Sequence, residues 1–230
     1  MQPTYSKALI IGAGSGLSRA LAQLFHEKGL AVALAARSPD DLSEFATEIG
    51  ASVHACDAGD HRQVADLFAA LDAEGAPDVL VYNPSARVMG PVAELDPEAV
   101  QAAVQVTALG AFFAAREAAQ RMVPAGHGAL LFTGASAGVK GFARSATFAM
   151  GKFALRGLAQ SLARELHPQG IHVGHFVIDG GIRNVERGWG DDPSAPDKFL
   201  DPEAIARSYW HFLEQDRSSW AWEIELRPWV

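Results

Sequence analysis

The sequence predicts an α/β fold: a single doubly wound domain whose parallel sheet of about seven strands is covered by helices on both faces. Short, continuously apolar runs alternate with longer segments of helical periodicity along the whole chain. The runs lack the alternation of a half-solvated strand, so both faces of the sheet must be covered. No linker, low-complexity tract or repeat interrupts the 230 residues, and their 49% hydrophobic content suffices for one large core. We therefore expect one domain over residues 1–230, built with right-handed crossovers.

The first half of the chain is expected to contain three strand–helix units and a fourth strand. In the first helix, Leu17, Leu21 and Phe25 fall on one face, and Gly29 follows as the residue that ends it. Ser38 has the position of an N-cap for the second helix, with a proline after it. The expected strands are Lys7–Ile11, Ala31–Ala36, Ser52–Cys56 and Val79–Tyr82, and the expected helices are Leu17–Lys28, Pro39–Ile49 and His61–Ala73.

The second half continues the alternation with two long helices. The second of them stops before Pro168, because the residue before a proline avoids helical geometry. A loop rich in Gly, Pro and Asp then runs from Asp179 to about Asp201, and residues 179–215 are the expected substrate loop and C-terminal segment. The expected helices are Pro97–Met122, Ser145–Leu166 and Pro202–Glu214, and the expected strands are Ala129–Thr133, His172–Ile178 and Ala221–Leu226. Five tryptophans are candidates for lining an apolar pocket or for core and dimer packing: Trp189, Trp210, Trp220, Trp222 and Trp229.

Composition excludes several classes of partner. The net charge is −8 without a basic block, which argues against nucleic acid. No apolar run reaches the roughly 18 residues of a membrane span, and the N-terminus lacks a secretory signal pattern. The lone Cys56 excludes an internal disulfide, and no Cys/His cluster has zinc spacing, so no metal site is expected. We expect a cytoplasmic protein that acts on a small molecule.

A glycine-rich turn follows the first strand and precedes the first helix. A pyrophosphate needs backbone approach without a Cβ in the way and free N–H groups at a helix start. The turn supplies both, and its position in the first unit of an α/β chain is that of a Rossmann-type dinucleotide site. The alternative is an ordinary strand–helix turn. The expected contacts with the cofactor are Gly12, Gly14, Ser15, Gly16 and Leu17.

The end of the second strand indicates which dinucleotide binds. An acidic residue about 20 positions after the glycines reads a free ribose 2′-hydroxyl, but here the strand ends in Arg37 and Ser38. Arg37 can pair with a 2′-phosphate and Ser38 can donate a hydrogen bond to it. The pattern favours NADP(H), with NAD(H) as the alternative if Arg37 is only a solvated surface residue.

These motifs resemble the short-chain dehydrogenase/reductase family over nearly the whole chain. The family's T-G-x-x-x-G-x-G pattern falls on Ile11–Ser18, with the threonine and the last glycine replaced. The resemblance implies that Asp57 contacts the adenine, although a helix N-cap is the alternative for it. It also gives cofactor roles to Asn83, from the family's N-N-A-G motif, and to Ile182, beside the nicotinamide carboxamide.

The family's catalytic tetrad of Asn, Ser, Tyr and Lys is degenerate in this sequence. The Y-x-x-x-K motif falls on Phe148 and Lys152, so only the lysine is kept. The serine position falls on Ala135, with Ser136 next to it as a stand-in, and the asparagine position falls on Thr107. The resemblance implies catalytic roles for Lys152 and Ser136, and for Lys152 also a contact with the nicotinamide ribose. Losing the general acid removes about 10²–10⁴-fold of rate. Tyr82 and Tyr209 are the alternative acids.

Two functions follow from this combination. The first is an NADP(H)-dependent oxidoreductase acting on a carbonyl, an alcohol or an activated alkene of a small molecule. The second is a catalytically inactive dinucleotide-binding sensor or partner subunit, suggested by Phe148. The long helices Pro97–Met122 and Ser145–Leu166 are dense in small residues, and in the family they form a dimer interface. We expect a homodimer or homotetramer; the alternative is that both helices only cover the sheet.

Overall fold

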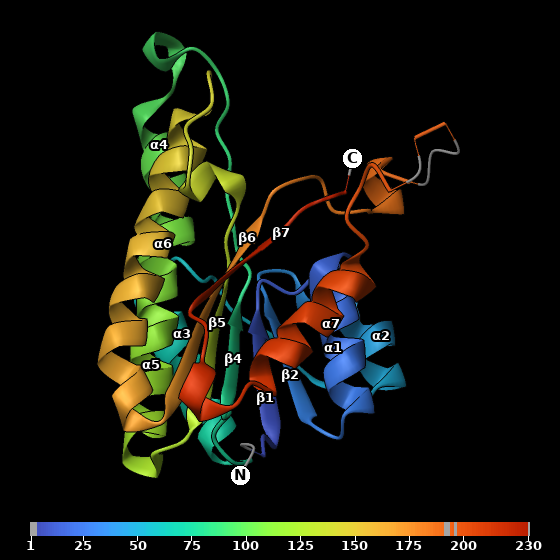
Figure 1. Cartoon of the computed structure of the whole chain (residues 1–230), viewed down its shortest axis with the longest axis vertical. Coiled ribbons are helices and arrows are strands. Elements are labelled where there is room, and N and C mark those ends of the chain that lie inside the picture. Colours follow the sequence, from blue (N-terminus) through green and yellow to red (C-terminus); the bar gives the residue numbers. More distant parts are fainter. Residues whose placement is uncertain (1–3, 191–193, 196, 230) are drawn as a thin grey trace.

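The computed structural model describes residues 4–190, 194–195 and 197–229. Within them the strands form one seven-stranded sheet in the order β3-β2-β1-β4-β5-β6-β7 (Figure 1). Every neighbouring pair of strands is parallel. The strands are β1 (Lys7–Ile11), β2 (Ala31–Ala36), β3 (Ser52–Ala55), β4 (Val79–Tyr82), β5 (Gly128–Thr133), β6 (Ile171–Ile178) and β7 (Glu223–Leu226). The expectation of a doubly wound parallel sheet is confirmed.

Helices cover both faces of this sheet. In Figure 1, α1 (Leu17–Glu27), α2 (Ser43–Glu48) and α7 (Pro202–Leu213) lie on one side. The other side carries α3 (His61–Asp72), α4 (Pro97–Val104), α5 (Gly110–Ala125) and α6 (Ala146–Leu166). Successive residues of β1 alternate between the two layers: Ile10 belongs to the core under α1 and α7, and Ile11 to the core under α3, α5 and α6. Strands buried on both faces explain the continuously apolar runs.

The strand order reverses between β1 and β4. The chain starts in the middle of the sheet, builds outward to β3 and returns to the other side of β1. In open α/β sheets, ligands bind at the carboxyl ends of the strands at such a switch point. The glycine-rich turn follows β1 and Asn83 follows β4, so both lie at this point.

The expected helix Pro39–Ile49 is wrong in its first turn. The structure has a 3₁₀ turn, η1 (Pro39–Leu42), before the short helix α2. Ser38 takes the N-cap position, but its side chain makes no capping hydrogen bond. The Ser43 N–H bonds to the carbonyl of Asp40, three residues back, which tightens this turn. The other expected elements, apart from the helix Pro97–Met122, end within about two residues of their expected bounds.

The expected helix Pro97–Met122 contains a π-helical segment, η3 (Gln105–Leu109), between α4 and α5. Here the Tyr82 hydroxyl donates to the Val106 carbonyl (2.5 Å), and Gly110 packs so closely on Ala58 and Tyr82 that a side chain would not fit. Such wide turns concentrate at functional sites. Thr107, at the position of the family's asparagine, lies in this segment.

Among the described residues, one helical stretch, Pro97–Ala125, meets the length and composition of a membrane span, with a mean hydropathy of 1.3. This test is weak, because core helices of globular domains pass it too. Here the stretch packs on α3 and α6, in the helical layer of the domain. About a third (33%) of the apolar window is buried within the fold.

Candidate functional site

The glycine-rich turn has the backbone shape that a bound phosphate needs. Gly12 has φ +80°, and a Cβ on it would lie 2.7 Å from the Pro84 nitrogen, so no other residue fits there. The N–H groups of Gly12 and Ala13 bond to the Ala35 carbonyl and tie the turn to β2. Gly16 is the N-cap of α1 and provides no side-chain cap. Among the described residues, the N–H groups of Ser15 and Gly16 find no backbone acceptor, so they remain available to an anion.

Asn83 holds this turn in place from β4. Its side-chain amide donates to Ser18 Oγ (2.7 Å), and Ser18 Oγ donates to the Gly12 carbonyl (3.0 Å). The Asn83 N–H also bonds to the Ile11 carbonyl (3.0 Å). Ser18 replaces the last glycine of the family pattern, and its hydroxyl joins the two strand ends. Asn83 therefore holds the glycine-rich turn in place through hydrogen bonds from the end of β4.

Arg37, Ser38 and Asp57 lie at the ends of β2 and β3. Arg37 and Ser38 are exposed, as a 2′-phosphate contact requires. Asp57 accepts a hydrogen bond from the Gly59 N–H (2.9 Å), while the N-cap of α3 is Asp60. The alternative of Asp57 as that N-cap is therefore wrong, and its half-buried carboxylate stands at the strand end, where the resemblance places the adenine.

The loop after β6 folds back onto the glycine-rich turn. The Ser15 hydroxyl donates to the Glu186 carboxylate (2.5 Å), and the Asn184 side chain lies against Gly16. Ile182 forms an isolated bridge with Leu200. Glu186 thus places a negative charge where the cofactor phosphates are expected. No local sequence pattern predicts this contact between Glu186 and Ser15. The expected substrate loop also includes residues 191–193 and 196, which lie outside the described residues.

Lys152 is the buried cation of the site. Its side chain comes from α6, is 2% exposed, and donates from Nζ to the Thr133 carbonyl (2.7 Å) at the end of β5. Burial, and to a smaller extent the nearby positive charge of Arg87, together lower the pKa of Lys152 to about 7. A buried ammonium fixed by a single carbonyl retains donors for ribose hydroxyls.

The positions of the family's serine and tyrosine are filled by an apolar cluster. Ala135, Ala137 and Phe148 pack together, and Phe148 is 8% exposed. Ser136 begins the 3₁₀ turn η4 (Ser136–Gly138) and is half-buried, and its hydroxyl bonds to none of the described residues. It remains a candidate, in a turn that packs against α6, the helix that carries Phe148 and Lys152.

Thr107 has a structural role. Its Oγ1 accepts from the Ala86 N–H (3.2 Å), and its side chain packs against Gly151 of α6 so closely that a Cβ there would lie 2.9 Å away. It is 1% exposed. Thr107 therefore joins the loop after β4 to α6, as a packing residue rather than a stand-in for the family's asparagine.

Arg87 enters the site from this loop, and the sequence reasoning missed it. Its guanidinium carbon lies 4.1 Å from the centre of the Phe148 ring, while Lys152 Nζ lies 5.9 Å from the same centre. Its position could have indicated a place near the site, because Arg87 lies five residues after β4, between the Asn83 motif and the long helix. An arginine over an aromatic face is a recurrent stabilising arrangement.

Tyr82 and Tyr209 cannot replace the missing acid. The Tyr82 hydroxyl is fully buried and bonds to Val106, and the Tyr209 hydroxyl is fully buried and bonds to Thr133 Oγ1 (2.9 Å). Burial raises the pKa of both phenols. Neither reaches a substrate at the strand ends.

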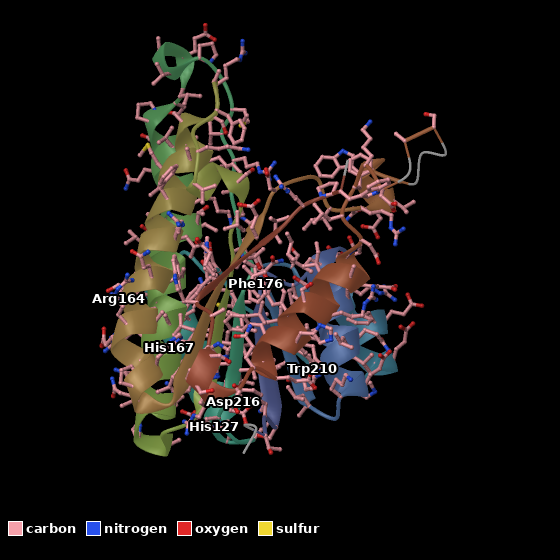
Figure 2. All side chains as sticks on the ribbon, in the orientation of Figure 1. His127, Arg164, His167, Phe176, Trp210 and Asp216 are labelled. Carbon is pink, nitrogen blue, oxygen red and sulfur yellow. The ribbon has the colours of Figure 1, made fainter. Side chains whose placement is uncertain are left out.

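Two of the five tryptophans lie at the substrate loop, and the other three pack elsewhere. Trp210 packs against Phe25 between α7 and α1 (Figure 2), and Trp220 stacks on His172 with ring centres 4.3 Å apart. Trp189 lies in the loop, stacked on Phe199, and Trp229 reaches the loop by donating from Nε1 to the Asp197 carboxylate (3.1 Å). The packing interpretation is therefore confirmed for Trp210 and Trp220.

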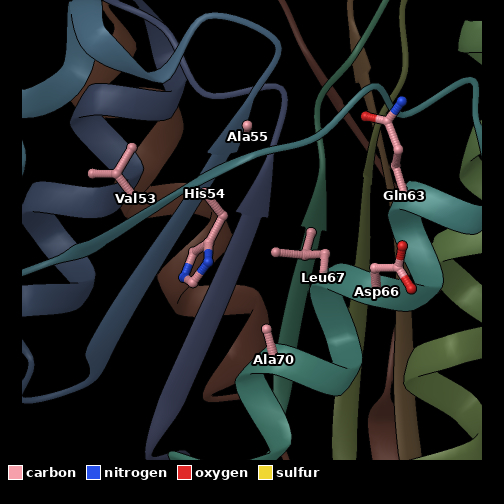
Figure 3. A pocket seen from close by; sticks show the side chains of 7 residues that line it. All are labelled: Val53, His54, Ala55, Gln63, Asp66, Leu67 and Ala70. Carbon is pink, nitrogen blue, oxygen red and sulfur yellow. The ribbon is translucent and has the colours of Figure 1, made fainter.

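A separate surface hollow lies between β3 and α3, at the edge of the sheet (Figure 3). None of the expected site residues lines it. Among the described residues, no three His, Cys, Asp or Glu side chains gather as metal ligands. The chemistry-bearing groups therefore lie at the switch point between β1 and β4 and along β5 and α6.

Comparisons with known proteins agree with this geometry. A family model described as short chain dehydrogenase matches residues 6–183. A curated relative from Staphylococcus aureus (strain N315), called an uncharacterised oxidoreductase, is 26% identical over 225 residues and 96% of both chains. A short-chain dehydrogenase structure from Rhodopseudomonas palustris is 32% identical with a TM-score of 0.84, covering 99% of this chain and 100% of that one.

A second solved structure, a metagenomic short-chain oxidoreductase in complex with NADP, is 25% identical with a TM-score of 0.83, covering 98% of this chain and 97% of that one. The family model covers well over half of the chain. Together with the sheet order and the glycine-rich turn, these matches lead to one conclusion: the chain belongs to the short-chain dehydrogenase/reductase family.

Proposed function

We propose that this protein is an NADP(H)-dependent oxidoreductase that reduces a carbonyl or an activated alkene of a small molecule. The observation that carries the proposal is Lys152, a fully buried ammonium held on the Thr133 carbonyl beside an intact glycine-rich turn. Among the described residues Lys152 has no carboxylate partner; such burial is costly, and a ligand's hydroxyl groups offset that cost. The relative that was solved with NADP supports the choice of cofactor.

The residues present fit the cofactor. The N–H groups of Gly14, Ser15, Gly16 and Leu17 would hold the pyrophosphate at the start of α1. Arg37 and Ser38 would hold the 2′-phosphate, Asp57 the adenine, Ile182 the carboxamide and Lys152 the nicotinamide ribose. The bound nicotinamide would supply the hydride. Titration with both NADPH and NADH distinguishes NADP(H) from NAD(H) as the bound cofactor.

The proton is the unusual part of the reaction. When hydride adds to a carbonyl carbon, the oxygen must take up a proton, and Phe148 has none to give. Lys152, Ser136 or a water must serve, and an activated alkene needs a weaker acid at the moment of transfer. The pocket around Phe148 therefore favours substrates whose developing charge is stabilised without a phenol.

The test is a titration of the wild type with NADPH and NADH, with turnover followed on a panel of carbonyl compounds and enones. We expect tighter binding of NADPH and steady oxidation of it by some members. Gly12→Ala is the control, because a Cβ there collides with Pro84, and it should lose both signals. Binding without turnover on any compound would favour the inactive sensor or partner subunit. No binding would refute both functions.

The outer faces of α5 and α6 support assembly of the chain into a homodimer. Two such dimers could associate into a homotetramer. Four large apolar side chains on these helices are 45–54% exposed: Leu109 in η3, Phe112 on α5, and Met150 and Phe153 on α6. Large apolar side chains exposed on neighbouring helices favour an interface at these helices. Light scattering at micromolar protein should show a dimer or tetramer, and a monomer alone would contradict the proposal.

We place the protein in the cytoplasm. Its lone Cys56 is a buried free thiol, whose pKa burial raises to about 11, and a reduced, unreactive thiol suits a reducing compartment. Cell fractionation with an antibody would test the assignment.

A further inference from the structure

His175 is a fully buried histidine of β6 that faces the same helical layer as Lys152. Successive residues of a strand point to opposite faces, and Val173, two residues before His175, belongs to the core under α3, α5 and α6. His175 therefore points toward α6, which packs on β6 (Figure 1). Its side chain is 0% exposed, and neither the glycine-rich turn nor the tetrad motif accounts for it.

Glu223 of β7 fixes the orientation of this ring. The Nδ1 atom of His175 lies 2.9 Å from the Glu223 carboxylate, and Arg156 of α6 donates to the same carboxylate with two nitrogens (2.7 and 2.8 Å). Burial lowers the pKa of His175 to about 4, although the bond to Glu223 acts in the opposite direction, so the ring is neutral at pH 7. A neutral ring beside a carboxylate donates from Nδ1, and its Nε2 is then an acceptor.

This acceptor atom lies beside the anchor of Lys152. The Nε2 atom of His175 is buried and has no hydrogen-bond partner among the described residues. It lies against Gly134, where a Cβ would collide with the ring, so only a glycine leaves room for the imidazole. The carbonyl that accepts from Lys152 Nζ belongs to Thr133, in the peptide bond between Thr133 and Gly134. The buried acceptor and the buried ammonium therefore lie at the same peptide bond.

The two groups complement each other chemically. An ammonium has three N–H donors, and the Thr133 carbonyl takes one of those of Lys152. A buried acceptor without a donor is costly, and so is a buried ammonium with one acceptor. Contact between Nζ and Nε2 satisfies both, and hydrogen bonds at active sites often tighten only when a ligand has bound. Among the described residues, the charged groups that act on His175 are Lys152 and Arg156 from α6 and Glu223 from β7.

We propose that Lys152 is the proton donor in place of the missing phenol, and that His175 and Glu223 hold it in position as a carboxylate–imidazole–ammonium triad. This inference rests on the proposed function and assigns its proton. As the carbon of a substrate carbonyl takes up hydride, its oxygen takes one proton from Lys152 Nζ. The neutral amine that remains regains a proton from water after the product leaves, so one hydride and one solvent proton are consumed for each carbonyl reduced.

Burial suits Lys152 to this role. A pKa of about 7 lets the ammonium release a proton at neutral pH, which an ordinary lysine does not do. His175 is a positioning residue: its Nε2 accepts from the ammonium, and the negative charge of Glu223 behind the ring favours the protonated form. Without this support, Lys152 should lose its proton at a lower pH.

The pH dependence of turnover tests the triad. His175→Leu removes the acceptor, and His175→Gln offers an amide oxygen in its place. We expect kcat/KM of the wild type to fall as the pH rises above neutral, because the ammonium is the reactive form. In His175→Leu the fall should begin at lower pH, so that kcat/KM is reduced about 3- to 10-fold more at about pH 8 than at about pH 6. His175→Gln and Glu223→Gln should lie between the wild type and His175→Leu.

His172 provides the matched control, because it is another fully buried histidine of β6, on the opposite face of the sheet. Its ring stacks on Phe212 of α7, with ring centres 4.0 Å apart. His172→Leu should keep the wild-type pH profile. A wild-type profile in His175→Leu would overturn the inference, even with a uniformly lower kcat, since His175 would then only fill the space beside Gly134.

A second measurement does not depend on turnover. NMR of the cofactor-free protein with isotope-labelled lysine follows the Cε signal of Lys152, assigned with Lys152→Met, from about pH 5 to about pH 10. We expect its titration to move to lower pH in His175→Leu and to stay in place in His172→Leu. Such a shift without turnover in the wild type would leave the triad standing while the proposed function fails. NADPH oxidation by the wild type with an unmoved Lys152 titration in His175→Leu would leave the function standing and refute the triad.

Discussion

At the scale of single residues, the site lacks the two hydroxyl groups of the family pattern as well as the asparagine, whose position is Thr107 here. Phe148 and Ala135 stand where the resemblance expects a tyrosine and a serine, and both pack into one apolar cluster with Ala137. Lys152, which in the family acts on the tyrosine, is kept with its anchor on Thr133. The lysine therefore has lost the partner whose pKa it would lower, although its own position is intact.

The substitution Phe148→Tyr should restore that partner. The new phenol would lie near Lys152, whose charge favours the phenolate, so we expect a gain of about 10²–10⁴-fold in kcat on carbonyl substrates at neutral pH. Stopped-flow measurement of NADPH oxidation checks this. Phe153→Tyr, which adds a phenol to the exposed face of the same helix, should change kcat little. No gain in a well-folded Phe148→Tyr protein would show that the pocket has diverged beyond the missing acid.

The stability of the cofactor-free protein should depend on Lys152. Its pKa is about 7 in the folded chain and near 10.4 when unfolded, so between these values the unfolded state binds more protons. The free energy of unfolding should therefore rise with pH from about 7 to about 10.4. Urea unfolding across this window measures the slope, and Lys152→Met should flatten it. An equal slope in both proteins would mean that Lys152 keeps its proton throughout.

At the scale of elements, the loop after β6 competes with the cofactor for one place. Glu186 in η6 (Val185–Arg187) accepts a hydrogen bond from Ser15, at the turn that would bind phosphates. The start of a helix attracts anions, and the Glu186 carboxylate lies beside this start through its contact with Ser15. When the cofactor binds, either Glu186 moves away or its negative charge remains close to the cofactor phosphates.

Glu186→Gln should therefore bind NADP(H) more tightly. Removing one negative charge near a phosphate is worth about 1 kcal/mol in a well-solvated place, or roughly fivefold in Kd. Fluorescence titration at low and high salt checks this, because screening should shrink the difference. Glu203→Gln at the start of α7 serves as the control and should show no change. If Glu186→Gln binds with the wild-type Kd, the loop moves away without an energetic cost.

At the scale of the whole molecule, α5 and α6 carry apolar side chains that the sheet does not cover. Met150 is 54% exposed and Phe112 is 46% exposed, although each belongs to a helix whose inner face is deeply buried. An uncovered surface of this kind lowers solubility unless a second copy packs on it. Assembly is therefore the expected state of this domain.

A charge on this face should prevent assembly. Met150→Glu places a carboxylate at the centre of the proposed interface, where burial without a partner is costly, so we expect a monomer. Light scattering coupled to gel filtration measures the mass. Gln160→Glu, farther along the same helix, is the control and should keep the wild-type mass. An unchanged mass in Met150→Glu would place the interface elsewhere.

The sequence by itself determined the order of the elements, the parallel sheet and the cofactor turn. These depend on local patterns, because a strand buried on both faces must be continuously apolar and a turn such as that at Gly12 tolerates no side chain. The loss of the family's acid at Phe148 was also visible, since the surrounding motif fixes its register. The interruption of a helix at η3 was not visible, because the contact that Tyr82 makes with this segment joins residues 24 positions apart.

Only the tertiary structure decided what now occupies the site. It brought Glu186 to Ser15 across 171 residues and Arg87 onto the ring of Phe148, and it buried Tyr82 and Tyr209 out of reach of a substrate. No periodicity or motif encodes such contacts, because they arise where loops from separate strands meet at one edge of the sheet. The sequence therefore indicated a dinucleotide site that lacks its usual acid, and the fold showed that an arginine and a lysine lie near the ring of the phenylalanine that replaces it.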